Sequence, residues 1–327
     1  MSKLNRRHVL VHGLAAAALM GSGAAFAQDD YPSKPVRLIS PWPVGGSADV
    51  TTRLVGDRLA ALLGQPFVVD ARGGAAGTIG FGVVARSSPD GYTLLLGTNS
   101  TYGIAPHLLP PTPYKISDFA PVALVAANPQ IICIHPSVPA KDLPSFIAHV
   151  RAHPGRYSYG SGGKGGTSHM ASVLLATTAG LNMLDVPYRG TGPSLQALLA
   201  GEVQMVALDV AVAKPLIEAG KVRALAVSSS RRSPAMPDLP TISELGYPGF
   251  DSATVYALFA PAGTPANIVA KLNRAINEML RQPDLRERFI ALGLDGMGGT
   301  PEEMARYINA ESDKWRDVIA RTGIKIE

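Results

Sequence analysis

The sequence predicts an α/β protein with mostly parallel sheets, flanked by helices and divided between two domains. Short apolar segments with strand character alternate with helical patterns along the chain, as in parallel strands joined by helical crossovers. Several of these segments run into glycine-rich loops that open the next helix. The 327 residues are enough for a large core, and chains of this length usually divide into two domains.

The first 27 residues have the features of an export signal. Two basic residues, Arg6 and Arg7, precede a weakly apolar run at 9–25, and the run ends in an Ala-x-Ala cleavage motif. The run is too short and too often interrupted to be a membrane anchor. The arginine pair favours the twin-arginine export route over the general secretory route. We therefore expect cleavage after Ala27 and a periplasmic mature protein.

Charge and cysteine content exclude some partners. The chain has 30 Lys and Arg against 25 Asp and Glu, but three of the basic residues and none of the acidic ones lie in the signal. A mature chain with so small and scattered an excess of positive charge is not expected to bind nucleic acid. No later apolar run reaches membrane-spanning length, so we expect a soluble mature protein. The single cysteine, Cys133, lies in an apolar run and is expected in a buried strand.

The elements follow one another in a regular order. In that order, strands are expected at 36–39, 67–69, 92–96, 131–134, 157–159, 183–186, 203–208, 222–227 and 253–260. The helices of the first half are expected at 47–63, 79–86 and 104–109. Residues 230–249 are rich in proline and glycine, which predicts a loop around one short helix near 242–245.

Two amphipathic helices are expected in the last third of the chain. Apolar side chains recur every four residues at Ile268, Leu272, Ile276 and Leu280. Thr264 and Pro265 are expected as N-cap and first residue of this helix. Thr300 and Glu303 have the spacing of a capping box that opens the last helix. Glu311 falls within the apolar stripe of that helix, so we expect it at the edge of the stripe.

One glycine loop matches a cofactor fingerprint. Gly160, Gly162 and Gly165 follow a strand, open a helix and satisfy the G-x-G-x-x-G pattern, and Asp185 follows near the next strand. An exported nucleotide-dependent oxidoreductase is therefore one hypothesis. Against it, the fingerprint normally opens its domain, whereas here a strand and a helix precede it.

The same loop physics suits a smaller anion. The first turn of a helix has free N–H groups, and the helix dipole favours negative charge there. The arrangement recurs at 40–49 and 71–78, with a polar version at 97–102. Ligands of open α/β sheets bind beyond the carboxyl ends of the strands. Loops from two domains are therefore expected to face each other across one cleft and to hold the two ends of an anion.

Short motifs over nearly the whole mature chain carry a specific resemblance. They are 31–39, the Pro-x-Gly-Gly-x-x-Asp pattern that ends at Asp49, 89–95, 118–122, 161–169, 186–190, 219–227 and 260–265. In this order the chain resembles the extracytoplasmic solute-binding proteins of tripartite tricarboxylate transporters, the Bug family.

The resemblance implies a two-domain flytrap fold in which each domain is a doubly wound, mostly parallel sheet flanked by helices. It implies capture of a small carboxylate (a di- or tricarboxylate, an aromatic acid or an acidic amino acid) and its delivery to a membrane permease. It implies no catalysis, no cofactor and no metal, and we expect a monomer. A ligand sensor for a membrane kinase would use the same site and is the alternative. Domain crossings near 128–129 and at 253–260 predict a first domain of 28–128 plus 254–327 and a second of 129–253, with the cleft between them.

Carried over by position, the resemblance implies ligand contacts from both domains. On the first domain they are Gly45, Gly46, Ser47 and Asp49. On the second they are Ser161, Gly165, Gly166, Thr167 and His169. The polar loop at 97–102 adds Thr98 and Ser100.

Three further candidates each have two interpretations. Lys164 either pairs with a carboxylate or points into solvent. Asp209 lies one position later than the acid of the Phe-Asp-Asn sequence that is frequent in relatives, so its role is open. Trp42 either roofs the ligand, which would suit a flat aromatic acid, or packs on the first helix.

Other constellations are less favoured. Neither Ser47 nor Ser161 lies in a G-x-S-x-G elbow, so a hydrolase is not expected, and His169 is expected to cap or orient its loop. His149 and His153 have a metal-ligand spacing, but no third ligand with motif spacing lies nearby. Histidines at the end of a helix are favoured by the dipole alone.

Overall fold

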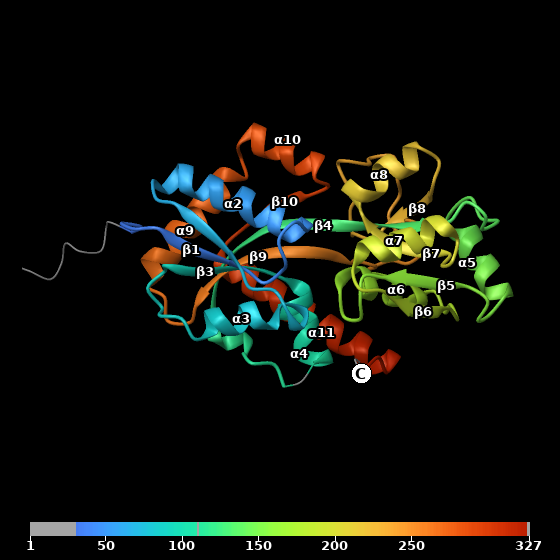
Figure 1. The fold of residues 1–327 in the computed structure, drawn as a ribbon, viewed down its shortest axis with the longest axis horizontal. Coiled ribbons are helices and arrows are strands. Elements are labelled where there is room, and N and C mark those ends of the chain that lie inside the picture. The colour runs from blue at the N-terminus through green and yellow to red at the C-terminus, as the bar shows by residue number, and fades with distance from the viewer. Residues whose placement is uncertain (1–30, 110, 326–327) are drawn as a thin grey trace, which may run out of the picture.

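The computed structural model describes residues 31–109 and 111–325, which form two lobes (Figure 1). The predicted export signal and its cleavage site lie outside the described residues. Within these residues, no helix has the length and apolar character needed to cross a membrane.

The first lobe is built on strands in the order β2-β1-β3-β9-β4, with β10 paired to β4. β1 is parallel to β2 and β3, whereas β9 is antiparallel to β3 and β4. The strands are β1 (Val36–Ser40), β2 (Phe67–Ala71), β3 (Thr93–Thr98), β4 (Phe119–Ile134), β9 (Ala253–Pro261) and β10 (Asp295–Gly298). Parallel strands with helical crossovers therefore form one half of this sheet, as predicted, and the returning chain adds the antiparallel half.

The second lobe uses the end of β4 as its first strand. β7 and β8 pair antiparallel with β4, and β5 is parallel to both β7 and β6. These strands are β5 (Ser158–Ser161), β6 (Leu184–Pro187), β7 (Met205–Asp209) and β8 (Arg223–Val227). All expected strands are present, with ends that differ by one or two residues except at β4, which is much longer than the expected segment 131–134.

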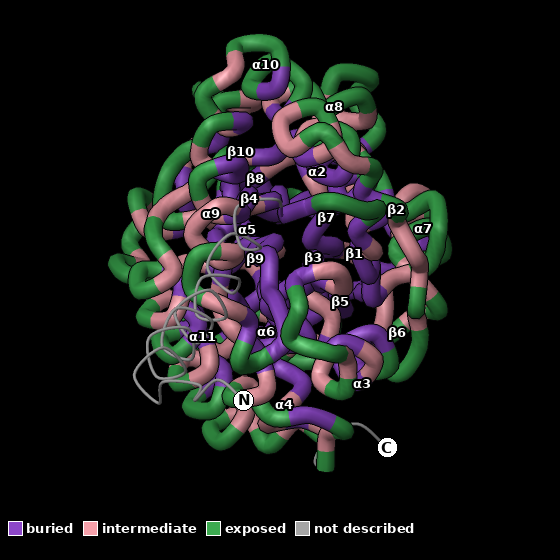
Figure 2. Tube along the Cα trace, turned by 90° about the vertical axis from the view of Figure 1, so that its left-hand side faces the viewer, coloured by how far each residue is buried: buried purple, intermediate pink, exposed green. Residues whose placement is uncertain are grey.

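Helices cover both faces of each sheet. In the first lobe they are α2 (Ser47–Leu63), α3 (Thr78–Ala85), α4 (Ala105–Leu108), α9 (Ala266–Met279), α10 (Pro283–Ala291) and α11 (Pro301–Thr322). In the second they are α5 (Leu143–Ala152), α6 (Thr167–Thr178), α7 (Thr191–Ala200) and α8 (Val210–Glu218). Figure 2 shows the central strands, such as β4 and β9, in the buried interior and the helices around them with exposed outer surfaces.

Alternation along the strands explains the double winding. In β3, Leu94 and Leu96 belong to the core under α2 and α9, whereas Leu95 belongs to the core under α3 and α11. In the second lobe, Ile132 faces the core of α5 and α6, and Cys133 faces that of α7 and α8. A strand with apolar side chains on both faces needs a helical layer on each side to exclude water. Cys133 is fully buried, as predicted.

The long strand β4 joins the two lobes. Its 16 residues pair with β9 as far as Pro129, and from Gln130 onward with β7 and β8. This change of partner lies beside the predicted crossing. The end of α11 also reaches the second lobe, because Trp315 shares a core cluster with Met170. The limits of the two domains stay a prediction.

Two local predictions were wrong. Residues 242–245 form a hydrogen-bonded turn and no helix. The Thr241 N–H donates to Glu244 Oε2, and the Glu244 N–H donates to Thr241 Oγ1. Gly246 follows with a φ of 105°, which ends the turn. Pro265 is the N-cap of α9, because the Thr264 hydroxyl donates to the Pro261 carbonyl at 2.7 Å. The capping box of α11 is confirmed, since Thr300 Oγ1 accepts from the backbone N–H of Glu303.

Glu311 is buried, so its expected place at the edge of the apolar stripe was wrong. Only 5% of its surface is exposed. Its Oε2 accepts hydrogen bonds from Asn99 Nδ2 at 2.9 Å and from Trp315 Nε1 at 3.0 Å, and its Oε1 pairs with the Lys314 ammonium. Burial of a carboxylate is tolerated when its lone pairs are satisfied in this way.

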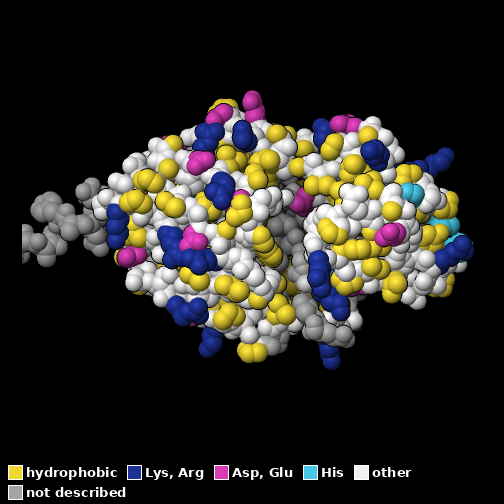
Figure 3. Space-filling model, in the orientation of Figure 1, with side chains coloured by type: hydrophobic (Ala, Val, Ile, Leu, Met, Phe, Trp, Pro, Cys, Tyr) yellow, Lys and Arg dark blue, Asp and Glu magenta, His cyan; other side chains and the backbone are white. Residues whose placement is uncertain are grey.

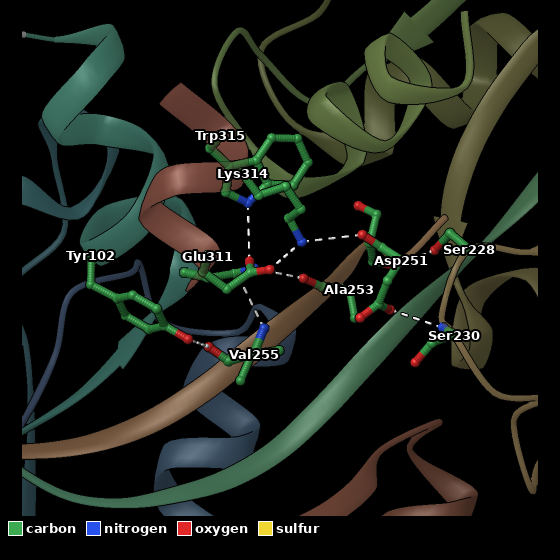
Figure 4. Close-up of polar contacts among 11 residues, drawn as sticks. Tyr102, Ser228, Ser230, Asp251, Ala253, Val255, Glu311, Lys314 and Trp315 are labelled. Atoms are coloured by element: carbon green, nitrogen blue, oxygen red, sulfur yellow. Dashed lines mark hydrogen bonds and ion pairs between the residues drawn. The ribbon is translucent and has the colours of Figure 1, made fainter. Parts of the chain in front are cut away.

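This carboxylate ties α11 to the start of β9 (Figure 4). Asn99 donates to the Ala253 carbonyl at 2.8 Å and accepts from the Val255 N–H at 3.0 Å. Lys314 Nζ donates to the Asp251 carbonyl at 3.1 Å. The network therefore fixes the segment through which the chain returns from the second lobe to the first.

Replacement of Glu311 by alanine is expected to destabilise the protein. The change leaves two buried donors and a lysine without their acceptor, which costs about 3 kcal/mol. The midpoint of thermal unfolding should then fall by about 6 °C or more. Glu278→Ala on the exposed face of α9 is the matched control. Equal midpoints for the two variants would contradict this role of Glu311.

Candidate functional site

Two glycine loops enter helices in the same way, one in each lobe. β1 ends at Ser40 and the chain enters α2 through Gly45 and Gly46, whereas β5 ends at Ser161 and the chain enters α6 through Gly165 and Gly166. Gly45 and Gly165 have positive φ angles of 91° and 80°. Glycine is suited to both positions because a side chain would be strained there. The two lobes thus repeat one structural device, as the sequence predicted.

Both helices begin without a side-chain cap. The N-cap residues are Gly46 and Gly166, and neither helix has a hydrogen bond from a capping side chain. The first N–H groups of α2 and α6 therefore stay open to an external acceptor, and the helix dipoles favour an anion there. Ser47 and Thr167 are the first residues of the two helices and add a hydroxyl group to each end.

A side chain four residues further on holds each loop from behind. The Gly45 N–H donates to Asp49 Oδ2 at 3.1 Å, and the Gly165 N–H donates to His169 Nδ1 at 3.2 Å. Asp49 and His169 are both buried. They therefore support the loops from inside and do not offer a free group to the cleft. This agrees with the expectation that His169 orients its loop.

The partners of these two side chains differ. Arg53 pairs with Asp49 at 3.0 Å, and this hydrogen-bonded arginine lowers the pKa of the Asp49 carboxyl despite its burial. His169 Nε2 lies 3.0 Å from Asp185 Oδ2. His169 Nδ1 accepts a hydrogen bond from the Gly165 N–H, so the neutral ring carries its hydrogen on Nε2. The Nε2–H group therefore donates a hydrogen bond to Asp185 Oδ2.

A hydrogen-bonded chain of side chains joins the two lobes, and we call this chain the cleft floor. Ser47 Oγ donates to Asp209 Oδ2 at 3.1 Å, and Gln130 Nε2 lies 3.5 Å from Asp209 Oδ1. Gln130 Nε2 also donates to Thr254 Oγ1 at 3.1 Å, and Thr254 Oγ1 lies 2.5 Å from Thr167 Oγ1. The first residues of α2 and α6 are thus linked through side chains of β7, β4 and β9.

Gln130 and Thr254 were not among the predicted site residues. The signal for Gln130 is a polar side chain in an otherwise apolar strand: Asn128 and Gln130 interrupt β4, and both are buried. Asn128 Oδ1 and Gln130 Oε1 have no hydrogen-bond partner among the described residues. Buried polar groups are normally satisfied, so this floor suits a polar ligand or solvent.

A cavity of about 180 Å³ adjoins the N-terminus of α2. Gly45, Gly46 and Ser47 line it from the first lobe, Asn128 from the joining strand and Ala211 from the second lobe. The cavity is therefore lined by groups from both lobes at one of the two open helix ends.

Trp42 is held by the polar loop that follows β3. Its indole N–H donates to Thr98 Oγ1 at 3.1 Å, and Thr98 Oγ1 lies 2.8 Å from Ser100 Oγ. Thr98 and Ser100 are buried, whereas Trp42 is half-buried. A Cβ on Gly77 would lie 3.5 Å from the Trp42 ring, so the glycine loop at 71–78, between β2 and α3, packs against the indole. Thr98 and Ser100 therefore hold Trp42 in place.

The remaining candidates of the second loop lie differently from one another. Ser161 is fully buried beneath the loop, and its Oγ has no partner among the described residues. Lys164 is half-buried and forms no ion pair or hydrogen bond within the described part of the chain. The structure thus leaves the Lys164 ammonium available and Ser161 inaccessible.

The dinucleotide interpretation of this loop loses its main supports. A Cβ on Gly162 would lie 2.9 Å from the Thr191 backbone nitrogen, so this glycine is required by packing against the next loop. Asp185, the candidate ribose ligand, is hydrogen-bonded to His169.

The candidate metal ligand His149 also has a local partner, since its Nε2 lies 2.5 Å from the Tyr157 hydroxyl. Among the described residues, no group of three or more potential ligands is placed to hold a metal ion.

Comparison with known families decides the assignment. The family described as tripartite tricarboxylate transporter family receptor matches residues 51–324. The chain belongs to this receptor family. It is 38% identical to Protein BugT of Bordetella pertussis, over 95% of this chain and 96% of the relative. It is 37% identical to a UPF0065 protein in the tcbD-tcbE intergenic region of Pseudomonas sp. (strain P51), over 98% and 95% of the two chains.

Solved structures of similar proteins share the fold. The R. palustris protein Rpa4515 with adipate superposes with a TM-score of 0.81 at 34% identity, over 90% of this receptor and 99% of that chain. The periplasmic binding protein BugD gives 0.77 at 32% identity, over 91% and 100%. MatC from Rhodopseudomonas palustris with bound malate gives 0.74 at 36% identity, over 88% and 100%. The receptor therefore has the two-domain periplasmic-binding-protein fold that the sequence predicted.

Loss of the His169 side chain is expected to loosen the second loop. In His169→Ala the Gly165 N–H loses its acceptor, whereas in His169→Asn the side-chain oxygen can take the place of Nδ1. Amide hydrogen exchange of the peptide 161–170 should be faster in the alanine variant and close to wild type in the asparagine variant. Equal exchange in both variants would contradict the proposed support.

Proposed function

We propose that this receptor captures a small carboxylate between its two lobes in the periplasm and delivers it to a tripartite tricarboxylate-type membrane permease. The observation that carries the proposal is the pair of open helix N-termini, α2 and α6, which belong to opposite lobes and are linked by one hydrogen-bonded chain. Each helix end suits one carboxylate group. The adipate and malate in the structures of two similar proteins support this class of ligand.

The proposed mechanism is closure of the lobes around the ligand. The ligand contacts both lobes only in the closed form, so it binds that form more tightly and shifts the population toward it. The permease would then recognise the closed receptor. A sensor for a membrane kinase would use the same closure and differ only in its partner.

The surface charge on the face drawn in Figure 3 gives no support to a nucleic-acid partner. Figure 3 shows Lys and Arg side chains scattered over both lobes on the face drawn, with Asp and Glu side chains among them. A nucleic-acid interface needs basic residues gathered in one stripe or patch.

A thermal-shift screen of residues 28–327 tests the function. The panel contains dicarboxylates, tricarboxylates, aromatic acids and acidic amino acids. NAD and NADP are included to test the oxidoreductase alternative. A ligand at about 100 times its dissociation constant adds roughly 2.7 kcal/mol, which should raise the midpoint by several degrees. We expect a rise with one group of carboxylates. A rise with nucleotides alone would contradict the proposal and favour the oxidoreductase.

Lys164→Ala is expected to weaken binding of the carboxylate found in that screen by about tenfold at low salt, because the variant removes a cation beside the α6 N-terminus. The loss should be smaller at high ionic strength, where exposed charges are screened. Lys221→Ala, an exposed lysine of the same lobe, is the control. Calorimetric titration measures both affinities, and an unchanged affinity in Lys164→Ala would place this side chain in solvent.

A further inference from the structure

Asp209 has an unusual orientation at the end of β7. It is the N-cap of α8, a position where aspartate normally accepts hydrogen bonds from its own helix. Here its side chain makes no such bond. It reaches instead to Ser47 at the N-terminus of α2 in the other lobe and to Gln130 on the cleft floor. A carboxylate of the protein therefore lies beside the N-terminus of α2, where the ligand's own negative charge is expected.

The charge of Asp209 is not balanced by a cation. Within residues 31–109 and 111–325, no lysine, arginine or histidine forms an ion pair with it. Burial raises the pKa of its carboxyl, although hydrogen bonds from Gln130, Ser47 and Asn128 act in the opposite direction. A half-buried carboxylate whose neighbours are neutral donors is incompletely compensated, and buried charges in proteins are normally paired.

This placement has a direct consequence for the ligand. A simple dicarboxylate at the α2 end would bring a second negative charge close to Asp209, and the two would repel each other. An ammonium group on the ligand would remove the repulsion and give Asp209 its missing partner. Lys164 on the α6 loop is a cation without a partner among the described residues, so it suits the far carboxylate.

We propose that Asp209 is the specificity-determining residue that makes this site select acidic amino acids over unsubstituted dicarboxylates of the same length. Its carboxylate accepts the ligand's ammonium group while the α2 N-terminus and the α6 loop hold the two ligand carboxylates. The inference rests on the proposed function and adds the chemical class of the ligand.

The experiment compares ligands that differ in one substituent. Calorimetric titration of the mature chain uses aspartate, malate and succinate, and then glutamate, 2-hydroxyglutarate and glutarate. In each series we expect the amino acid to bind at least tenfold more tightly than the unsubstituted acid. Asp209→Asn keeps the size of the side chain and an acceptor for Ser47. It should weaken amino-acid binding about 30-fold and strengthen binding of the unsubstituted acid, so that the preference disappears. Glu202→Gln removes an exposed charge from the same lobe and should leave the preference unchanged.

Each outcome decides the inference. A preference for malate or succinate over aspartate in the wild type, together with the same order in the longer series, would overturn it. So would an Asp209→Asn variant that folds with a wild-type melting midpoint and keeps the preference for the amino acid. Binding without any preference contradicts the role of Asp209 alone, whereas failure of all six carboxylates to bind contradicts the proposed function as well.

Discussion

The continuity of strand β4 through both lobes is the constraint on which the rest of the structure depends. One backbone ladder serves two sheets: β9 pairs with the strand as far as Pro129, and β7 and β8 pair with it from Gln130 onward. On either side of this junction the strand is apolar, because its side chains there pack into the cores of the two lobes. At the junction itself the strand is polar. The floor of the cleft is therefore polar because the strand passes between two cores there.

The two lobes present the same helix end with different chemistry. Asp49 with Arg53 supports one loop, and His169 with Asp185 supports the other, although both act on the N–H of a glycine with positive φ. Two charged side chains beside these helix ends, Lys164 and Asp209, belong to the second lobe and have no ionic partner among the described residues. A symmetric backbone device with an asymmetric charge pattern suits a ligand whose two ends differ.

The C-terminal helix contributes to the cleft without lining it. Glu311 accepts from Asn99, and Asn99 lies between Thr98 and Ser100 in the loop that holds Trp42. The same asparagine bonds Ala253 and Val255 of β9, the two residues that flank the floor residue Thr254. Stability of α11 and the geometry of the first-lobe loop are therefore expected to be coupled through one buried amide.

The sequence by itself determined most of the strands and helices and the two glycine loops that open α2 and α6, because strand alternation, helix periodicity and glycine-rich turns are set by neighbouring residues. Helix α2 and the capping box of α11 follow from such local signals. Only the tertiary structure decided which side chains meet at the cleft floor. Ser47 and Asp209 are 162 residues apart in the chain, and Gln130 and Thr254 are 124 apart. Contacts of this range depend on how β4, β7 and β9 pair, and no local sequence pattern determines that pairing. The buried hydrogen bond from Asn99 to Glu311 could not be predicted for the same reason.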